Sequence, residues 1–153
     1  MKEKDNTMNR TAEEALRLDN QLCFPLYAAS REVVKQYHPL LASLNLTYTQ
    51  YLVMLVLWEK APVSEKEMGV RLHLDSGTLT PVLKSLEAKG YILRTRSKED
   101  ERVVCVLLTD AGAALKNNAG DVPGQISASI PLTEEEAATL HELLYKILNN
   151  PEK

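Results

Sequence analysis

Apolar residues in the first third of the chain recur at steps of three and four, which is the period of a helix with one buried face. This spacing predicts a long amphipathic helix over 13–44, which Pro25 should kink or restart. The following segment, 49–60, is apolar on nearly every side and predicts a buried helix with Thr49 as a possible cap. The positions that define the first stripe are Leu22, Leu26, Ala29, Val33, Tyr37, Leu40 and Leu44.

Two further helices are predicted in the middle of the chain. Ser64 and Glu67 have the spacing of a capping box, so a short helix should run from there to about residue 71. A longer helix should begin at Asp75 or Ser76 and stop at Gly90. Its apolar face consists of Leu79, Val82, Leu83 and Leu86.

A β-hairpin and two terminal helices complete the pattern. The runs YILRTR and RVVCVLL alternate like strands and flank the charged segment SKEDE, which predicts a hairpin. Thr109 should start a helix that ends near residue 119, and GDVPGQISASIP is interpreted as a loop. Thr133 and Glu136 form another capping box before a last amphipathic helix.

The order of elements predicts a mainly α fold with a small β-hairpin wing. A short helix, a second helix and a two-stranded hairpin in succession are typical of the winged helix-turn-helix, here 47–108, which would be the DNA-binding lobe. The helices at 13–44 and 109–149 have apolar stripes without an obvious partner inside one domain of 1–153. We therefore expect them to form the interface of a homodimer, whose two-fold symmetry would match a palindromic operator in double-stranded DNA.

Composition and charge narrow the class of protein. The 153 residues are 44% hydrophobic and 25% charged, as in an ordinary globular domain. The net charge of −3 argues against nucleic acid, but segment 84–102 carries six basic and four acidic residues and is locally basic. The first ten residues, MKEKDNTMNR, are polar and predict no targeting segment. The longest apolar run, LVMLVLW, is too short to span a membrane. Together they predict a cytoplasmic location. Neither a metal nor a cofactor is expected, because the two cysteines form no cluster and the dispersed histidines lack ligand spacing.

The helix SGTLTPVLKSLEAKG carries candidate DNA-contact residues on its polar face. Ser76, Thr80 and Lys84 follow at i, i+4 and i+8, and Thr78 lies near that edge. Hydroxyl groups and a lysine can contact base edges or phosphates in a groove. Pro81 leaves a second start of this helix open, with Thr80 as its cap and Pro81 in the first position. The alternative is an ordinary solvated helix face.

The hairpin tip carries candidate contacts for phosphates or for a minor groove. Arg94, Arg96, Lys98 and Arg102 surround the acidic tip, and Asp100 would hold the guanidinium of Arg102 in place. If these side chains contact phosphates, affinity for DNA should fall steeply with salt. The alternative is a solubilising hairpin with a weak local ion pair.

The run LDNQLCFPLYAASREVVKQYHPLLASLNLTYTQYLVMLVLWE, together with LDSGTLTPVLKSLEAKG and RSKEDER, resembles the organic-hydroperoxide-sensing repressors of the MarR family, the OhrR type. The resemblance covers most of residues 18–110. It implies that Cys23 forms hydrogen bonds to tyrosines of the partner subunit, and that its oxidation reorganises the dimer and releases DNA. The matching tyrosines are Tyr27 and Tyr37, with Tyr48 nearby.

The resemblance is to the one-cysteine kind of these repressors, because no cysteine follows Cys105. Oxidised Cys23 would then become a sulfenic acid and afterwards a mixed disulfide with a low-molecular-weight thiol, or be oxidised further irreversibly. Cys105 alternates with β-branched neighbours in a strand and is interpreted as a core residue.

The residues around Cys23 support a reactive role independently. On a helix that advances about 100° per residue, Tyr27 and Tyr37 both lie within about 40° of Cys23. Tyr37 is too far along the axis to reach Cys23 of the same chain, but a symmetric antiparallel contact would bring it from the other subunit. The reacting species would be a thiolate, which phenolic O–H groups stabilise. The alternative is an inert buried cysteine with tyrosines that only pack.

These observations predict a dimeric repressor, not an enzyme, that senses organic hydroperoxides or related oxidants through Cys23. Three alternatives remain open at this stage. The chain would be a MarR-type regulator of a small phenolic ligand, a thiol peroxidase, or a winged helix that contacts only proteins. The peroxidase alternative lacks a resolving cysteine and leaves the helix-turn-helix unexplained.

Overall fold

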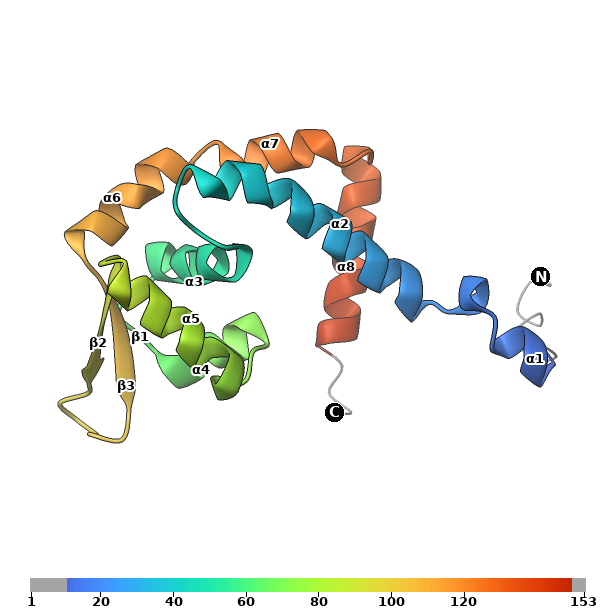
Figure 1. Cartoon of the computed structure of the whole chain (residues 1–153). Coiled ribbons are helices and arrows are strands. Elements are labelled where there is room, and N and C mark those ends of the chain that lie inside the picture. Colours follow the sequence, from blue (N-terminus) through green and yellow to red (C-terminus); the bar gives the residue numbers. More distant parts are fainter. Residues whose placement is uncertain (1–10, 150–153) are drawn as a thin grey trace.

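The computed structural model describes residues 11–149 and has a mainly helical fold with a small antiparallel sheet (Figure 1). The predicted fold class is confirmed. The elements are α1 (Ala12–Ala15), the 3-10 helix η1 (Leu18–Asn20), α2 (Cys23–Ala42), α3 (Tyr48–Glu59), β1 (Val63–Ser64), α4 (Glu65–Leu72), α5 (Ser76–Ala88), β2 (Ile92–Arg96), β3 (Val104–Leu108), α6 (Asp110–Ala119), α7 (Val122–Ser129) and α8 (Glu134–Leu148).

The winged lobe consists of α3, α4, α5 and the sheet, which pack around one core (Figure 1). Helix α3 lies in its middle, as the apolar sequence of that helix predicts, and contributes three of the fully buried apolar side chains. Burial of such side chains stabilises the fold by about 1.5–3 kcal/mol each. The fully buried members of this core are Val53, Met54, Leu57, Met68, Leu79, Leu83, Leu86, Ile92 and Val106.

The wing is a hairpin of β2 and β3 with a third, two-residue strand beside it. The strand order is β1-β3-β2 and both pairs are antiparallel. Val63 of β1 and Arg94 of β2 both lie opposite Val106 of β3. The sequence predicts only the hairpin, because a strand of two residues is too short to show an alternating pattern.

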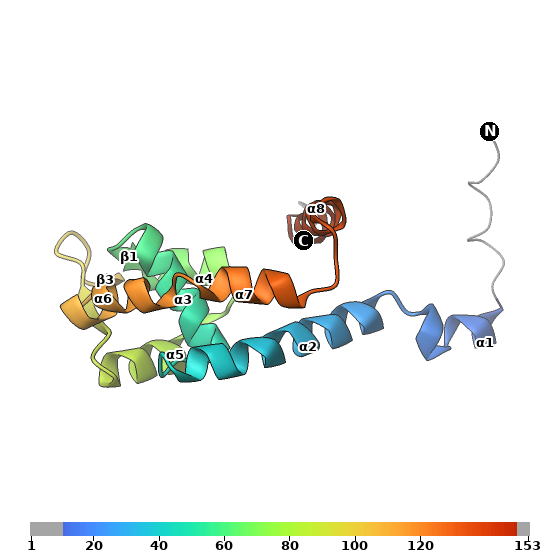
Figure 2. The same cartoon turned by 90° about the horizontal axis from the view of Figure 1, so that it is seen from above.

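Outside the lobe, α2 and α7 lie side by side, and α8 lies apart from the winged lobe beyond the end of α7 (Figures 1 and 2). The segment with α1 extends away from the body beyond the first turn of α2 (Figure 2). No residue of α1 or α8 is buried, and α2 buries only Leu41. Among residues 11–149, no helix is both long enough and apolar enough to cross a bilayer.

Helix α2 begins at Cys23, so the helix predicted over 13–44 is not continuous, and the restart expected at Pro25 is observed. Pro25 restarts the helix, because a proline in the first turn removes an N–H that has no helical partner there. The segment before it is organised separately. The side chains of Asn20 and Gln21 donate to the carbonyl oxygens of Glu14 and Ala15, at 2.7 and 2.6 Å, and terminate α1.

Four other helix starts can be compared with the expectations. Thr47, not Thr49, caps α3 and forms a capping box with Gln50. Asp75 caps α5, and Pro81 lies inside that helix, so the alternative start at Thr80 is wrong. Thr109 and Thr133 cap α6 and α8 as predicted.

Residues 122–129 form helix α7, where the sequence predicts a loop. Pro123 lies in the first turn, and Gly124 lies on the exposed side, so neither interrupts the helix. Val122 and Ile126 are buried, four residues apart on one face, in a helix that packs along α2. Tertiary packing therefore overrides a local composition that is typical of loops.

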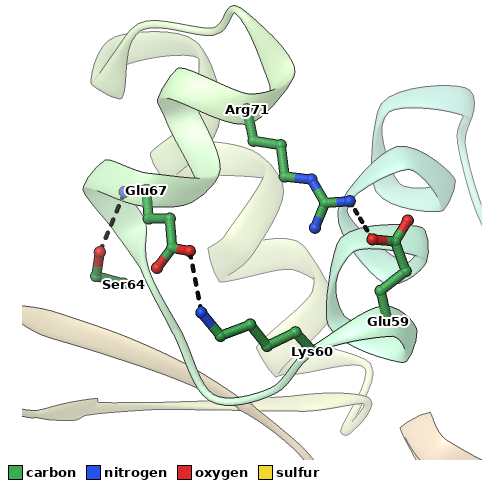
Figure 3. A network of polar contacts seen from close by, with 5 residues as sticks. All are labelled: Glu59, Lys60, Ser64, Glu67 and Arg71. Carbon is green, nitrogen blue, oxygen red and sulfur yellow. Dashed lines mark hydrogen bonds and ion pairs between the residues drawn. The ribbon is translucent and has the colours of Figure 1, made fainter.

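Ion pairs join the end of α3 to α4 (Figure 3). Arg71 pairs with Glu59, and Lys60 Nζ lies 3.4 Å from Glu67 Oε1. Ser64 Oγ accepts from the Glu67 N–H at 3.1 Å, but the Glu67 side chain turns to Lys60 and does not complete the predicted capping box. These exposed pairs contribute roughly 1 kcal/mol or less each and mainly orient α4.

Candidate sensor and DNA-contact sites

Cys23 is the first residue of α2 and is exposed in the single chain. Its neighbours form an uncovered apolar surface, with Leu22 78% exposed and Phe24 and Leu26 about half as much. Exposed apolar side chains in a continuous group mark a surface for contact with another protein. The sulfur therefore lies at the edge of a face that is suited to a second subunit.

Tyr27 lies one helical turn from Cys23 and is also exposed, at 60%. Its hydroxyl accepts from Arg31 Nη1 at 3.4 Å, and the Arg31 guanidinium lies 5.5 Å from the ring centre. This cation–π contact orients the ring on the helix surface. Cys23, Tyr27 and the uncovered apolar side chains thus share the first turns of α2.

Tyr37 belongs to a different cluster, further along α2. Its ring centre lies 4.8 Å from that of Tyr48 and 5.8 Å from that of Tyr51, both on α3. Burial raises the pKa of each of these three phenols above its usual range, and for Tyr37 the neighbouring Tyr48 and Tyr51 raise the pKa further. At neutral pH all three are uncharged and can donate an O–H hydrogen bond.

One chain does not bring Cys23 and Tyr37 together. The two residues are 14 positions apart on one helix, which corresponds to about 21 Å along its axis. The resemblance marks Tyr37, with Tyr48 nearby, but it does not mark Tyr51. The available signal was the i, i+3 spacing of Tyr48 and Tyr51, which puts both rings on one face of α3.

Helix α5 presents most of the predicted polar face. Ser76, Thr78 and Lys84 are exposed, and Thr80 is half-buried. Thr78 is partly engaged within the cap, because its N–H and hydroxyl lie 2.8 and 3.3 Å from the Asp75 carboxylate. The N-terminal turn of α5 and this face are therefore available to a ligand such as DNA.

The tip of the wing holds Arg102 as the sequence predicts. The Arg102 side chain is 92% exposed, and its Nε lies 3.3 Å from Asp100 Oδ1. Arg96 donates from Nη1 to the carbonyl oxygen of Glu101 at 2.7 Å, and Lys98 is exposed. Three cations are thus grouped around the turn between β2 and β3.

Arg94 lies at the base of the wing and not at its tip, which corrects the prediction. Its guanidinium lies 2.9 Å from Glu87 of α5 and 3.6 Å from Glu65 of α4, and the side chain is only 21% exposed. The Arg94 N–H and guanidinium hold the pKa of the Glu87 carboxyl below its usual range. Arg94 therefore fastens the wing to the helices and is not brought together with the other cations.

Cys105 is half-buried in β3, opposite Ser64 of β1 and Thr95 of β2. Val106, on the other face of the sheet, is fully buried. Cys105 therefore lies at the edge of the core and not inside it. The uncovered apolar surface around Cys23 belongs to another part of the molecule.

The arrangement is that of a winged-helix DNA-binding protein. It consists of the capped helix α4, helix α5 with an exposed polar face, and a basic wing formed by β2 and β3. Residues 35–119 match the family described as transcriptional regulator SarA/Rot. The organic hydroperoxide resistance transcriptional regulator of Bacillus subtilis (strain 168) is 53% identical over 133 residues, which are 87% of this chain and 90% of that protein.

Solved structures of AbfR, a protein of Staphylococcus epidermidis, are also similar. Reduced AbfR bound to DNA is 37% identical, with a TM-score of 0.74 over 90% of this chain and 96% of that one. Overoxidized AbfR bound to DNA is likewise 37% identical, with a TM-score of 0.74 over 90% and 97%. The chain belongs to the SarA/Rot family of MarR-like winged-helix transcriptional regulators, and within it to the organic-hydroperoxide regulator type. The resemblance found in the sequence is confirmed.

Proposed function

We propose that this regulator is a homodimeric repressor in the cytoplasm that binds a palindromic operator and releases it after an organic hydroperoxide oxidises Cys23. The observation that carries the proposal is the position of Cys23 in the exposed first turn of α2. It lies among exposed apolar side chains that a second subunit would bury. The phenol of Tyr37 lies towards the other end of the same helix, where its ring packs against Tyr48 of α3. A two-fold partner with an antiparallel α2 would bring them to the sulfur.

The chemistry at Cys23 proceeds in two steps. The thiolate attacks the terminal peroxide oxygen, so that an S–O bond forms, the O–O bond breaks and sulfur gives up two electrons, while the leaving alkoxide takes a proton from water and departs as an alcohol. The resulting sulfenic acid then condenses with a low-molecular-weight thiol, forming an S–S bond and releasing water. Neutral phenols at the site would donate hydrogen bonds to the thiolate before the first step.

We assign release of DNA to the mixed disulfide. A bulky adduct in the first turn of α2 would not fit beneath a partner subunit without moving it. The relative AbfR has been crystallised on DNA in its overoxidized form, which supports a releasing species other than an overoxidized sulfur.

DNA would be held by the polar face of α5 and by the wing. The hydroxyl groups and the lysine of α5 would enter the major groove, and the wing cations would contact phosphates or the minor groove. Each phosphate neutralised by a cation steepens the fall of affinity with salt. The proposed contacts are Ser76, Thr78, Thr80, Lys84, Arg96, Lys98 and Arg102, with Asp100 orienting Arg102. In this proposal residues 47–108 form the DNA-binding lobe, and 13–44 and 109–149 dimerise.

The test compares DNA binding before and after oxidation. A duplex is first selected from a random pool with reduced wild-type protein, and its dissociation constant is then measured by fluorescence anisotropy. Cumene hydroperoxide with cysteine should weaken binding by wild type at least about tenfold, within the usual range for coupled sites. Cys23→Ser should keep its affinity under the same treatment, and Cys105→Ser should respond like wild type.

Other results would point to other functions. A Cys23→Ser variant that still releases DNA with cumene hydroperoxide would contradict sensing by this sulfur. Release by a phenolic compound but not by hydroperoxide would favour a small-ligand regulator. Steady consumption of many equivalents of hydroperoxide in the presence of a thiol reductant would favour a peroxidase.

A further inference from the structure

A group of polar side chains ties the end of α5 to the turn between α2 and α3. Lys89, which follows the last residue of α5, donates from Nζ to the Asn45 carbonyl oxygen at 2.6 Å and to Gln50 Oε1 at 2.8 Å. Gln50 Nε2 donates to Ser85 Oγ at 2.9 Å. We call Asn45, Gln50, Ser85 and Lys89 the α3–α5 clamp.

Gln50 is the centre of the clamp. Its side chain is almost fully buried, with 5% of the residue exposed. Every hydrogen bond of its amide goes either to the α2–α3 turn or to the end of α5, because Oε1 also accepts from the Thr47 N–H at 3.0 Å. A buried amide with all its partners in place fixes the position of those partners, since losing one leaves a polar group unpaired.

The same turn of α3 carries the phenol cluster. Tyr48 and Tyr51 flank Gln50 in the sequence, and their rings pack against Tyr37 of α2. The first turn of α3 therefore contacts the proposed sensing region with its tyrosines and the DNA-contacting helix with its glutamine. A movement of Tyr37 and Tyr48 must carry the Gln50 backbone with it, because one helical turn is a rigid unit.

We infer that Gln50, Ser85 and Lys89 are positioning residues that transmit the oxidation of Cys23 to α5. This inference rests on the proposed function. Leu83 and Leu86 also hold α5 in the lobe, but apolar packing is non-directional and would keep the helix buried through a small rotation. The clamp instead consists of directional hydrogen bonds between the end of α5 and the α2–α3 turn with the start of α3. A shift of that turn therefore reorients α5 and its polar face.

The experiment breaks the α5 side of the clamp and leaves the cap of α3 intact. Ser85→Ala/Lys89→Met is made in the full chain with Cys105→Ser, so that Cys23 is the only thiol. Binding to the selected duplex is measured by anisotropy before and after treatment with cumene hydroperoxide and cysteine. The reduced variant should bind within about threefold of its parent, but oxidation should weaken its binding by no more than about threefold, against at least about tenfold for the parent.

A matched control separates coupling from loss of charge or of stability. Lys116→Met removes the same charge and a similar bond, because Lys116 Nζ donates to the Trp58 carbonyl oxygen at 3.2 Å, but it does not touch α5. The control should release DNA like the parent. Lys89→Met alone keeps the bond between Gln50 and Ser85. The ratio of its dissociation constants after and before oxidation should lie between those of the parent and the double variant. It also provides a milder variant if the double variant does not fold.

The outcomes distinguish the inference from the function on which it rests. If the parent releases DNA and the clamp variants release it to the same extent, the clamp does not transmit the signal and the inference is overturned. If Lys116→Met loses its response as well, the effect belongs to charge or stability and the inference is again overturned. If the parent itself keeps its DNA after oxidation, the proposed function fails first.

Discussion

Arg94 and Arg102 are the same kind of residue in the same hairpin, but their surroundings give them different roles. Arg94 faces two carboxylates at the base of the wing and is mostly covered, whereas Arg102 stands 92% exposed at the tip beside Asp100. Charge that is already paired within the lobe contributes little to attraction of phosphates. Of the wing arginines, Arg94 is therefore a structural residue, and Arg96 and Arg102 remain as the proposed DNA contacts.

The bond between Arg94 and Glu87 predicts a particular dependence of stability on pH. The pKa of the Glu87 carboxyl is lowered from about 4.5, chiefly by the Arg94 N–H and then by its guanidinium. A group with a depressed pKa stabilises the fold fully above its usual pKa and loses this effect as the pH falls through the lowered value. The difference in free energy of unfolding between wild type and Glu87→Gln should be constant near pH 7 and shrink below about pH 4.5.

Urea denaturation at pH 7, 5, 4 and 3 measures this difference. Glu99→Gln is the control, because Glu99 lies exposed in the wing tip and does not contact Arg94. Its difference from wild type should show no such step. Parallel curves for wild type and Glu87→Gln across the whole range would contradict the assignment.

Sequence identifies individual site residues when a local pattern marks them. Cys23 stands in a distinctive motif, and Asp100 and Arg102 are two positions apart in one turn, so both sites can be predicted. The spacing of Tyr48 and Tyr51 puts them on one face of α3, but the contact of Tyr51 with Tyr37 depends on how α2 crosses α3, which the sequence does not give. The fate of Arg94 likewise depends on residues 7 and 29 positions earlier in the chain, which only the fold brings to it.

Helices with strong caps are predicted well, and those that depend on packing are not. Side-chain caps at Thr109 and Thr133 set the starts of α6 and α8 as expected. Helix α7 has no side-chain cap bond and is held by its buried face against α2, so local composition suggests a loop. Proline is a guide at one position and not at the other, because the restart expected at Pro25 is observed, whereas Pro81 is tolerated inside α5.

The junction between α6 and the sheet predicts a sharp contrast between two glycines. A Cβ on Gly112 would overlap the Tyr91 carbonyl oxygen and lie 3.2 Å from a Leu108 methyl group, whereas a Cβ on Gly124 would meet nothing within 4 Å. Gly112→Ala should lower the free energy of unfolding by about 3 kcal/mol, because the contact is with backbone that cannot move aside. Gly124→Ala should raise it by up to about 1 kcal/mol, since alanine favours an exposed helix.

Urea denaturation of both variants at pH 7 measures the contrast. Gly112 also matters beyond its own space, because its carbonyl oxygen accepts from Trp58 Nε1 at 2.9 Å and joins α6 to α3. Equal stability of the two variants would mean that α6 does not approach the sheet as closely as described.

At the level of the whole molecule, most of the exposed large apolar side chains of residues 11–149 lie on elements outside the winged lobe. Helix α8 exposes a stripe of large side chains, and the first turns of α2 expose another. Apolar surface of this extent on separate helices is what a dimer interface buries. The exposed members on α8 are Leu140, Leu143, Ile147 and Leu148.

A charge in the middle of the α8 stripe should therefore separate the subunits. Leu143→Glu should raise the dimer dissociation constant by about a hundredfold or more, because an unpaired carboxylate would be buried at the contact. Ala138→Glu adds the same charge on the opposite side of α8, on an exposed position, and should leave the dimer intact. Sedimentation equilibrium measures both, and a dimeric Leu143→Glu would place the interface elsewhere.

The length of α2 has a consequence for how such a regulator would behave in a cell. The twenty residues of α2 keep Cys23 and Tyr27 near one end and Tyr37 near the other, so a single chain holds parts of two sites and no complete one. Under the proposed function, each sensing site is therefore composed of residues from both subunits. An intact cysteine in one subunit senses oxidant only if the partner subunit has intact tyrosines. A defective subunit would therefore impair the mixed dimers that it forms with wild-type subunits as well as its own homodimers.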